Sequence, residues 1–305
     1  MGDLLRNKVA IVTGSGRGIG RAEALALAAQ GAKVVVNDLG GDRGGKGVAR
    51  TPADEVVAEI KKSGGQAVAN YESVADFKAA SRIIQAALDS FGRLDILVNN
   101  AGITRHNLIS DMTEEDWDAV VAVNLKGTFN TCHHAIKVMK PQGSGRIINT
   151  VSNQWRQPEG HVNYAAAKGG VVSLTWGIAW ELQNTDITCN ALAPFAYTRM
   201  LDTSSDNRHK LVEAGLMKEV RFNQVEDRPG PEFVAPLVVY LASDDAANIT
   251  GHIFRCGGGK VAVYSHPNEI SSIYKNHKKY GPWALEELKE LVSKSLMARV
   301  KSWWD

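Results

Sequence analysis

The sequence predicts an α/β protein in which about seven parallel strands form a doubly wound sheet. Short apolar runs of strand length recur along the chain, at 9–12, 34–36, 67–69, 96–98, 147–148, 187–189 and 252–254. Helix-forming segments separate these runs, and uninterrupted apolar strands that alternate with helices are typical of a parallel sheet covered on both faces. A glycine-rich turn also joins the first run to a helix-forming segment, which is the arrangement of a dinucleotide-binding βα unit.

The composition disfavours several classes of function. The 305 residues are 44% hydrophobic, enough for a substantial core, and the formal net charge of +2 is nearly balanced. Because the basic residues are spread along the chain, we expect no extended nucleic-acid-binding face. Residues 1–8 contain no apolar leader, and no apolar stretch reaches the roughly 20 residues that cross a bilayer. We therefore expect no membrane insertion and a cytoplasmic or organelle-matrix location.

Neither a disulfide nor a metal site is expected. Cys132, Cys189 and Cys256 lie far apart in apolar or glycine-rich surroundings, as buried free thiols do. His106 and His161 lie near the predicted site, but a histidine without a carboxylate or a second ligand is more often a packing or surface residue.

The chain is predicted to form one large domain, residues 1–265, with a helical extension at 266–305. Residues 40–52 are a glycine-rich, basic insertion that we expect to be a mobile loop. A polar, weakly patterned stretch at about 197–231 is predicted to be a substrate lid with a short helix near 210–220. In the extension, an amphipathic helix is expected from Trp283 to about Val300.

A cofactor site is predicted after the first strand, where Gly14, Gly18 and Gly20 precede a helix-forming run. Glycines there allow a tight turn, and they let backbone N–H groups at the helix N-terminus approach a pyrophosphate. Asp38, at the end of the second strand, can accept the ribose hydroxyls of NAD and would repel the 2′-phosphate of NADP. Arg17, with Arg43 and Lys46 in the next loop, favours NADP, but we predict NAD because the acid faces the ribose.

Five motifs in order resemble the short-chain dehydrogenase/reductase family. They are Thr13-Gly14-x-x-x-Gly18-Ile19-Gly20, Asn99-Asn100-Ala101-Gly102, Asn124, Ser152 and Tyr164-x-x-x-Lys168. The resemblance covers about residues 5–260 and implies a Rossmann-type sheet, NAD(P)-dependent hydride transfer between a secondary alcohol and a ketone, and homodimers or homotetramers.

The resemblance also implies which residues form the site. The catalytic residues it implies are Asn124, Ser152, Tyr164 and Lys168, and the cofactor-binding residues are Gly14, Arg17, Gly18, Ile19, Gly20, Asp38, Ser73, Val74, Asn100, Ala101 and Gly102, together with Tyr164 and Lys168. Ser73 and Val74 match positions near the adenine, and Glu72 is the nearest candidate for the acid that usually accompanies them. Asn124 is expected to hold a water that links Lys168 to solvent.

The spacing of Tyr164 and Lys168 has a direct chemical meaning. In a helix these two positions lie one turn apart on the same face. At an effective dielectric near 20, an ammonium about 5 Å from the phenol would lower the phenol pKa by roughly two units. The spacing therefore predicts a general acid/base whose pKa is brought toward neutrality. Ser152 can hold the substrate oxygen beside this phenol.

A narrower similarity concerns the substrate. The segments Asn37-Asp38-Leu39-Gly40-Gly41-Asp42, Val68-Ala69-Asn70-Tyr71-Glu72-Ser73-Val74, Arg199-Met200 and Pro231-Glu232-Phe233-Val234-Ala235-Pro236-Leu237 are similar to the (3R)-hydroxyacyl-CoA dehydrogenase domain of peroxisomal multifunctional enzyme type 2 and its bacterial relatives. This similarity favours a 3-hydroxyacyl-CoA substrate.

Two bulky residues leave other substrates open. Trp155 is expected either to line the substrate pocket or to pack at a dimer edge, and Phe195 is expected to narrow the pocket mouth. These side chains also suit a hydroxysteroid or another bulky or cyclic secondary alcohol. A non-catalytic dinucleotide-binding subunit is the alternative of another class, but it would gain nothing from a polarised phenol.

Overall fold

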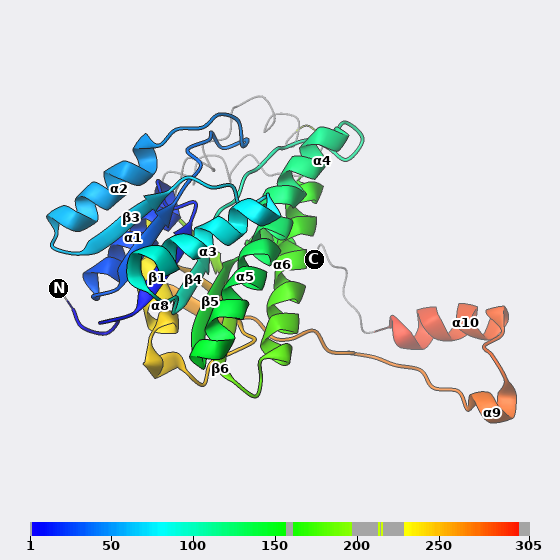
Figure 1. Cartoon of the computed structure of the whole chain (residues 1–305). Helices are drawn as coiled ribbons and strands as arrows, with labels where there is room; N and C mark the ends of the chain where they lie inside the picture. Colours follow the sequence, from blue (N-terminus) through cyan, green and yellow to red (C-terminus); the bar gives the residue numbers. More distant parts are fainter. Residues whose placement is uncertain (1, 157–160, 197–212, 214, 216–228, 299–305) are drawn as a thin grey trace. The chain divides into compact units, whose positions relative to one another are not determined.

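The computed structural model describes residues 2–156, 161–196, 213, 215 and 229–298, and the strands of these residues form one sheet in the order β3-β2-β1-β4-β5-β6-β7-β8 (Figure 1). All neighbouring strands are parallel except β7 and β8. The strands are β1 (Val9–Thr13), β2 (Lys33–Asn37), β3 (Gln66–Asn70), β4 (Ile96–Asn99), β5 (Ser144–Thr150), β6 (Asp186–Pro194), β7 (Ile253–Gly257) and β8 (Lys260–Val263). The predicted doubly wound parallel sheet is confirmed.

The eighth strand was not predicted. β8 pairs antiparallel with β7 through a two-residue turn at Gly258 and Gly259, and Gly258 has a φ of +59° that suits a tight hairpin. It has only four residues, and Val261 and Val263 are exposed at the sheet edge. A glycine pair between two short runs was the available hairpin signal.

Helices cover both faces of the sheet, and α3, α5 and α6 lie across the face turned toward the viewer in Figure 1. The longer helices are α1 (Gly18–Ala29), α2 (Thr51–Lys62), α3 (Phe77–Phe91), α4 (Glu114–Val121), α5 (Gly127–Gln142), α6 (Val162–Glu181) and α8 (Ala235–Ala242). Short turns are η1 (Ala122–Lys126), η2 (Asn153–Trp155), η4 (Pro231–Phe233) and η5 (Asp244–Ala246).

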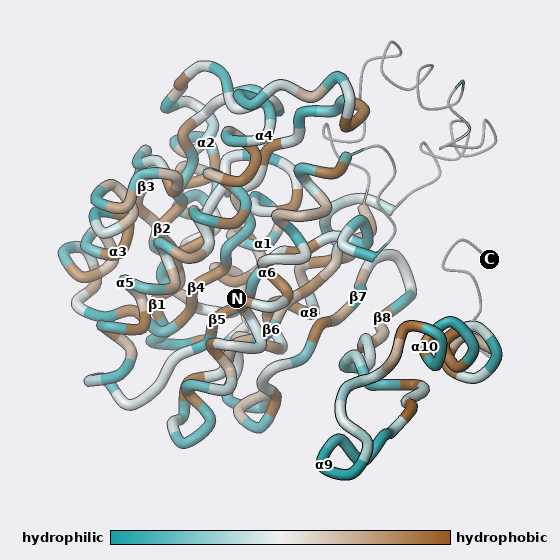
Figure 2. Tube along the Cα trace, turned by 90° about the vertical axis from the view of Figure 1, so that its right-hand side faces the viewer, coloured by the Kyte–Doolittle hydropathy of each residue, from teal (hydrophilic) through white to brown (hydrophobic). Residues whose placement is uncertain are grey.

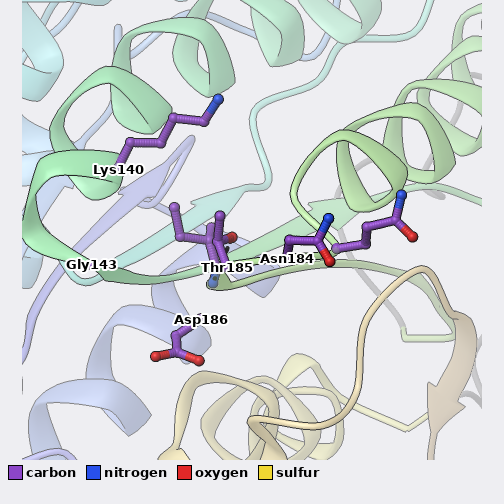
Figure 3. Close-up of a pocket in the computed structure, with 7 residues that line it drawn as sticks. Lys140, Gly143, Asn184, Thr185 and Asp186 are labelled. Carbon is purple, nitrogen blue, oxygen red and sulfur yellow. Dashed lines mark hydrogen bonds between the residues drawn. The ribbon is translucent and has the colours of Figure 1, made fainter.

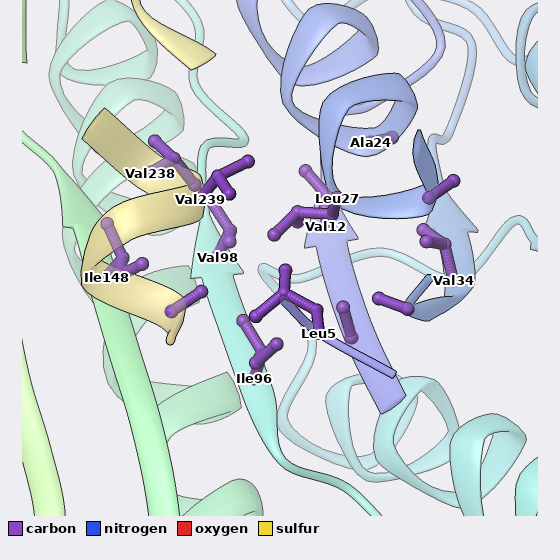
Figure 4. Close-up of a cluster of buried hydrophobic side chains, with 14 of the residues drawn as sticks. Leu5, Val12, Ala24, Leu27, Val34, Ile96, Val98, Ile148, Val238 and Val239 are labelled. Carbon is purple, nitrogen blue, oxygen red and sulfur yellow. The ribbon is translucent and has the colours of Figure 1, made fainter. Parts of the chain in front are cut away.

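The core has two halves because successive side chains of a strand point to opposite faces. Ala10 and Val12 of β1 pack with α1, α2 and α8, in the cluster drawn in Figure 4. Val9 and Ile11 of the same strand pack with α3, α5 and α6. The strand is buried along its whole length, which explains the uninterrupted apolar pattern of its sequence.

The strand order reverses beside β1, since β2 lies on one side of it and β4 on the other. Loops that leave the carboxyl ends of β1 and β4 turn to opposite faces of the sheet. Ligands of doubly wound proteins bind in the crevice between such loops. The glycine turn after β1 and the Asn-Asn-Ala-Gly segment after β4 both lie at this edge.

The insertion at 40–52 is hydrogen-bonded, and its last two residues already belong to α2. Within it, the Asp42 carboxylate accepts the backbone N–H groups of Gly44 and Lys46 at 2.9 and 2.8 Å. Outside it, the Arg43 carbonyl accepts the N–H of Thr104 at 3.1 Å, and the Gly44 carbonyl accepts Arg105 Nε at 3.1 Å. The insertion is therefore connected to the segment that follows β4.

Residues 265–305 form a separate unit from residues 1–264. The described part contains α9 (His277–Tyr280), α10 (Leu285–Leu291) and the π-helical turn η6 (Val292–Leu296). Glu287 caps α10, because its carboxylate accepts the Ala284 N–H at 2.8 Å and pairs with Lys275 at 2.6 Å. Hydrophobic and hydrophilic residues both occur along α10 (Figure 2). The helix begins at Leu285 rather than at the predicted Trp283 and gives way to η6 after Leu291, and the predicted end near Val300 lies outside the described residues.

Candidate active site

The glycine turn after β1 is shaped by close approaches of backbone and side chains. Gly14 has a φ of +64°, and a Cβ atom there would lie 2.8 Å from the Cα of Ala101. A Cβ atom at Gly20 would collide with the amide of Asn100 and the carbonyl of Gly14. Helix α1 begins at Gly18, and no side chain caps its N-terminus. The first-turn N–H groups therefore remain suited to an anionic ligand, and the residues present fit a dinucleotide pyrophosphate.

Asp38 braces this turn from the end of β2. Its carboxylate accepts the N–H of Gly16 at 2.7 Å and that of Gly40 at 2.6 Å. A Cβ atom at Gly16 would lie 2.9 Å from the same carboxylate, so only glycine lets the acid come this close. The half-buried carboxylate thus lies against the glycine turn, which is where an acid of a dinucleotide-binding fold accepts hydrogen bonds from the ribose hydroxyls of the cofactor. Arg17 is exposed at the N-cap position of α1.

The segment after β4 is joined to the glycine turn. Asn100 Nδ2 donates to the carbonyls of Thr13 and Gly14, both at 3.0 Å. The Thr13 hydroxyl accepts the backbone N–H groups of Asn100 and Ala101 at 3.1 and 3.0 Å. Thr13 is fully buried and joins the two segments of the site. It is the first residue of the glycine motif, but the sequence predicted no separate role for it.

The predicted adenine side contains one departure from expectation. Val74 is buried, and its carbonyl accepts Asn130 Nδ2 at 2.8 Å, while the Ser73 hydroxyl accepts the N–H of Ala75 at 3.3 Å. Glu72, the nearest candidate for the expected acid, pairs with Arg82 of α3 at 2.7 Å. This carboxylate is therefore committed to a partly exposed ion pair.

Ser152, Tyr164 and Lys168 come together where β5 ends and α6 begins. Lys168 is buried, its Nζ donates to the Thr150 carbonyl at 2.7 Å, and the same Nζ lies 5.6 Å from the centre of the Tyr164 ring. The Ser152 hydroxyl is hydrogen-bonded to the Tyr164 phenol. The predicted alignment of Tyr164 and Lys168 on one helix face is thus present, and Thr150 anchors the lysine through a carbonyl that the sequence could not single out.

The expected lowering of the Tyr164 pKa is wrong for this structure. Burial raises the pKa of the Tyr164 phenol to about 12, and the hydrogen bond with Ser152 opposes this rise only in part. Burial also lowers the pKa of Lys168 to about 7. The solvent exclusion that disfavours the phenolate therefore disfavours the ammonium that was expected to stabilise it.

Asn124 lies in η1, a π-helical turn between α4 and α5. Its Nδ2 donates to the carbonyls of Ile103 and Val120 at 3.0 and 2.9 Å. Its Oδ1 is buried and has no hydrogen-bond partner among the described residues, and a Cβ atom at Gly102 would lie 2.6 Å from it. Turns of this kind often occur at functional sites. The unsatisfied acceptor fits the predicted role of holding a water.

Trp155 packs against the end of the β8 hairpin. Its ring meets that of Tyr264 edge-on, with ring centres 5.7 Å apart, and the Arg156 guanidinium lies 5.3 Å from the centre of the Tyr264 ring. The Tyr264 hydroxyl is also hydrogen-bonded to Asn153 Oδ1. These contacts are within one chain, and the two predicted roles of Trp155, pocket wall and dimer edge, stay predictions.

Phe195 contacts the neighbouring strand β7. Its backbone N–H donates to the Cys256 carbonyl at 2.7 Å, and the Arg255 guanidinium lies 5.5 Å from the centre of its ring. Its effect on the pocket mouth stays a prediction, because most of the predicted lid at 197–231, including Arg199 and the short helix at 210–220, lies outside the described residues.

Two further expectations concern histidines and cysteines. The rings of His106 and His161 lie close together, with centres 3.7 Å apart and planes tilted by 35°. Within the described ranges, no group of three or more His, Cys, Asp or Glu side chains is arranged to hold a metal ion. Cys132, Cys189 and Cys256 are buried and free, as expected for core thiols.

No helix in the described part of the chain is long and apolar enough to cross a membrane.

A hollow of about 460 Å³ lies elsewhere in the fold (Figure 3). It is lined by residues at the end of α5 and at the start of β6: Lys140, Gly143, Gln183, Asn184, Thr185, Asp186 and Ile187. These residues lie at the amino edge of β5 and β6, whereas Ser152 and the glycine turn follow the carboxyl ends of their strands. This hollow is therefore not the candidate active site.

Comparisons with known proteins agree with this geometry. The sequence model of the family described as short chain dehydrogenase matches residues 8–209. The chain is 41% identical over 252 residues to peroxisomal multifunctional enzyme type 2 of Drosophila melanogaster, covering 82% of this chain and 39% of that protein. It is 44% identical over 261 residues to a 3-oxoacyl-(acyl-carrier-protein) reductase of Synechocystis sp., covering 84% of this chain and 98% of the reductase. A crystal structure of a short chain dehydrogenase from Mycobacterium avium matches with a TM-score of 0.81 and 39% identity, covering 98% of this chain and 97% of that one.

The sheet, the glycine turn and the tyrosine–lysine pair define an α/β oxidoreductase that acts on CH–OH groups. The chain belongs to the short-chain dehydrogenase family. The predicted likeness to peroxisomal multifunctional enzyme type 2 is confirmed, and the chain spans 39% of the length of the fruit-fly enzyme.

Proposed function

We propose that the protein is an NAD-dependent dehydrogenase that interconverts a secondary alcohol and a ketone, with a 3-hydroxyacyl-CoA as its substrate. The observation that carries the reaction class is that Tyr164 has both the Ser152 hydroxyl and the Lys168 side chain as close neighbours. A tyrosine with a hydroxyl and an amine beside it is the arrangement expected of a general acid/base, which transfers a proton to or from the substrate.

NAD is favoured over NADP by Asp38. Its carboxylate faces the glycine turn at the position where a ribose hydroxyl would be recognised. A 2′-phosphate brought to the same place would meet a fixed negative charge, and the repulsion is stronger in a partly buried site than in water. Arg17 at the start of α1 is the cation nearest in sequence to the turn, but it is exposed.

Each residue of the group has a separate part in the reaction. The cofactor, when bound, supplies or accepts the hydride. In the reductive direction, Tyr164 donates its phenol proton to the carbonyl oxygen, and a phenol with a raised pKa is fully protonated for this step at neutral pH. Ser152 holds the same oxygen. Lys168 is held by the Thr150 carbonyl, and when the lysine is protonated its positive charge stabilises the Tyr164 phenolate.

The substrate class is supported by resemblance rather than by the geometry. The Drosophila relative is a peroxisomal multifunctional enzyme, and the Synechocystis relative carries an acyl-carrier-protein substrate in its name. Both names are compatible with acyl thioesters. We also propose a homo-oligomer in the cytoplasm or an organelle matrix, as predicted from the sequence.

A substrate panel tests this function. The purified protein is mixed with NAD or NADP and with 3-hydroxyacyl-CoAs, hydroxysteroids or simple secondary alcohols, and nicotinamide absorbance is followed. Turnover of the thioesters with NAD is expected. Turnover only of steroids or simple alcohols would refute the substrate class and keep the reaction class. Binding of NADH without any turnover would favour a non-catalytic dinucleotide-binding subunit.

A further inference from the structure

Asn163, directly before Tyr164 in the first turn of α6, is fully buried. Its Nδ2 donates to the carbonyls of Arg105 and Asp116, both at 3.1 Å. Its Oδ1 accepts the backbone N–H of Tyr164 at 2.7 Å. Both N–H donors and the carbonyl of the amide are thus used within the protein, away from water. One side chain connects the turn that carries Tyr164 to two other segments.

The two acceptors of Asn163 are themselves held together. Arg105 Nη1 lies 3.5 Å from the Asp116 carboxylate, and Asn107 Nδ2 donates to the same carboxylate at 3.0 Å. Asp116 is in the first turn of α4, whose N-cap is the Thr113 side chain. The carbonyls that Asn163 binds therefore have fixed positions relative to each other.

Arg105 extends this connection to the cofactor side. Its Nε donates to the Gly44 carbonyl at 3.1 Å, and the N–H of the preceding Thr104 donates to the Arg43 carbonyl at 3.1 Å. Gly44 and Arg43 belong to the insertion that follows Asp38. Hydrogen bonds thus run from this insertion through Thr104 and Arg105 to the turn that carries Tyr164.

We propose that Asn163 is a positioning residue, which keeps the Tyr164 phenol in place beside Ser152 by fastening the first turn of α6 to Arg105 and Asp116. This inference rests on the proposed function. Tyr164 is the first residue of α6 that must reach the substrate oxygen, and a displacement of about 1 Å at a reacting group can reduce turnover by about 100-fold. An enclosed amide with three fixed partners prevents such a displacement.

Three variants separate positioning from general stability. Asn163→Ala removes all three hydrogen bonds. Asn163→Asp keeps the shape and the acceptor for the Tyr164 N–H, but it places a carboxylate against two carbonyl oxygens. Asn107→Ala is the matched control, because it removes a hydrogen bond to the same Asp116 and leaves α6 untouched.

The measurements are turnover, NADH affinity by fluorescence, and the ¹³Cζ NMR signal of Tyr164 in protein with labelled tyrosine, assigned with Tyr164→Phe. In both Asn163 variants we expect kcat to fall by about 10- to 100-fold, NADH affinity to stay within a few-fold and the Tyr164 signal to move. Asn107→Ala removes only one of the contacts that hold Asp116 and keeps all three hydrogen bonds of Asn163, so each of these quantities should change much less than in the Asn163 variants.

An unmoved Tyr164 signal in Asn163→Ala would overturn the inference. So would an equal effect of Asn107→Ala, or a loss of kcat matched by an equal loss of NADH affinity. If the unsubstituted protein turns over no substrate of the panel, the proposed function fails, and the NMR comparison alone decides whether Asn163 positions the phenol.

Discussion

Glu23 is a buried acid that makes the stability of the protein depend on pH. It lies on α1 with an exposure of 0%, and neither carboxylate oxygen has a hydrogen-bond partner among the described residues. Burial raises its pKa from 4.5 to about 8. The nearby Cys256 thiol of β7 has its pKa raised to about 12 by burial and by the charge of Glu23. At neutral pH the folded protein therefore holds Glu23 as the neutral acid.

The sign and size of the pH effect follow from this shift. Below a pH of about 4.5 both folded and unfolded chains are protonated at Glu23, so burial of the group costs no ionisation energy. Above it the unfolded chain loses the proton first, and each further pH unit lowers the free energy of unfolding by about 1.4 kcal/mol. The loss reaches about 3 kcal/mol near pH 7 and levels off near about 5 kcal/mol once the folded pKa of about 8 is passed.

Glu23→Gln tests this reasoning, since it keeps the shape and removes the titration. Urea unfolding is measured at several values between about pH 5 and about pH 8, at one protein concentration. The free energy of unfolding of the variant, taken relative to that of the unsubstituted protein, should increase by about 3 kcal/mol between the lowest and the highest pH. Glu59→Gln, which removes an exposed partner of Arg21 at the outer side of α1, is the control and should leave the slope unchanged. Equal pH slopes for Glu23→Gln and the unsubstituted protein would refute the argument.

Three further predictions concern the site and the extension. Tyr164→Phe should abolish turnover and leave NADH affinity within a few-fold, because the phenol moves a proton and the ring remains; full activity would contradict the mechanism. Asp38→Ser should shift the ratio of kcat/KM for NAD over NADP by about tenfold or more toward NADP, the expected size for removing about 1–2 kcal/mol of charge repulsion; an unchanged ratio would remove Asp38 as the selector. Deletion of residues 266–305, where Leu285 is 67% exposed, should lower the oligomeric state in light scattering or change substrate choice; no change in either would show that the extension has neither role.

The strands and the cofactor turn were predictable because their signals are local. A strand buried on both faces must be apolar throughout, so β1 is visible in the sequence itself. The turn at Gly14 requires a positive φ that glycine alone adopts easily, and this requirement also marks the sequence. The edge strand β8 is short and mostly exposed, so its pattern carried little information.

Glu23 and Asn163 show what could not be predicted. Each is an ordinary polar residue in a helix-forming segment, with no motif of its own. Glu23 is buried because β7 and α8 close over α1, and Asn163 is satisfied because α4 and the segment after β4 meet its amide. These partners are distant in sequence, so their approach depends on how the helices pack.

The sequence by itself determined that Tyr164 and Lys168 share a helix face, because helical periodicity is a local property. It also determined the sheet and the place of the glycine turn. Only the tertiary structure decided how this pair titrates. Burial raises the pKa of Tyr164 to about 12 and lowers that of Lys168 to about 7, opposite to what a Coulomb attraction between exposed groups predicts for the phenol. The cost of charging a group depends on how much water remains around it, and this is set by every segment packed over the site.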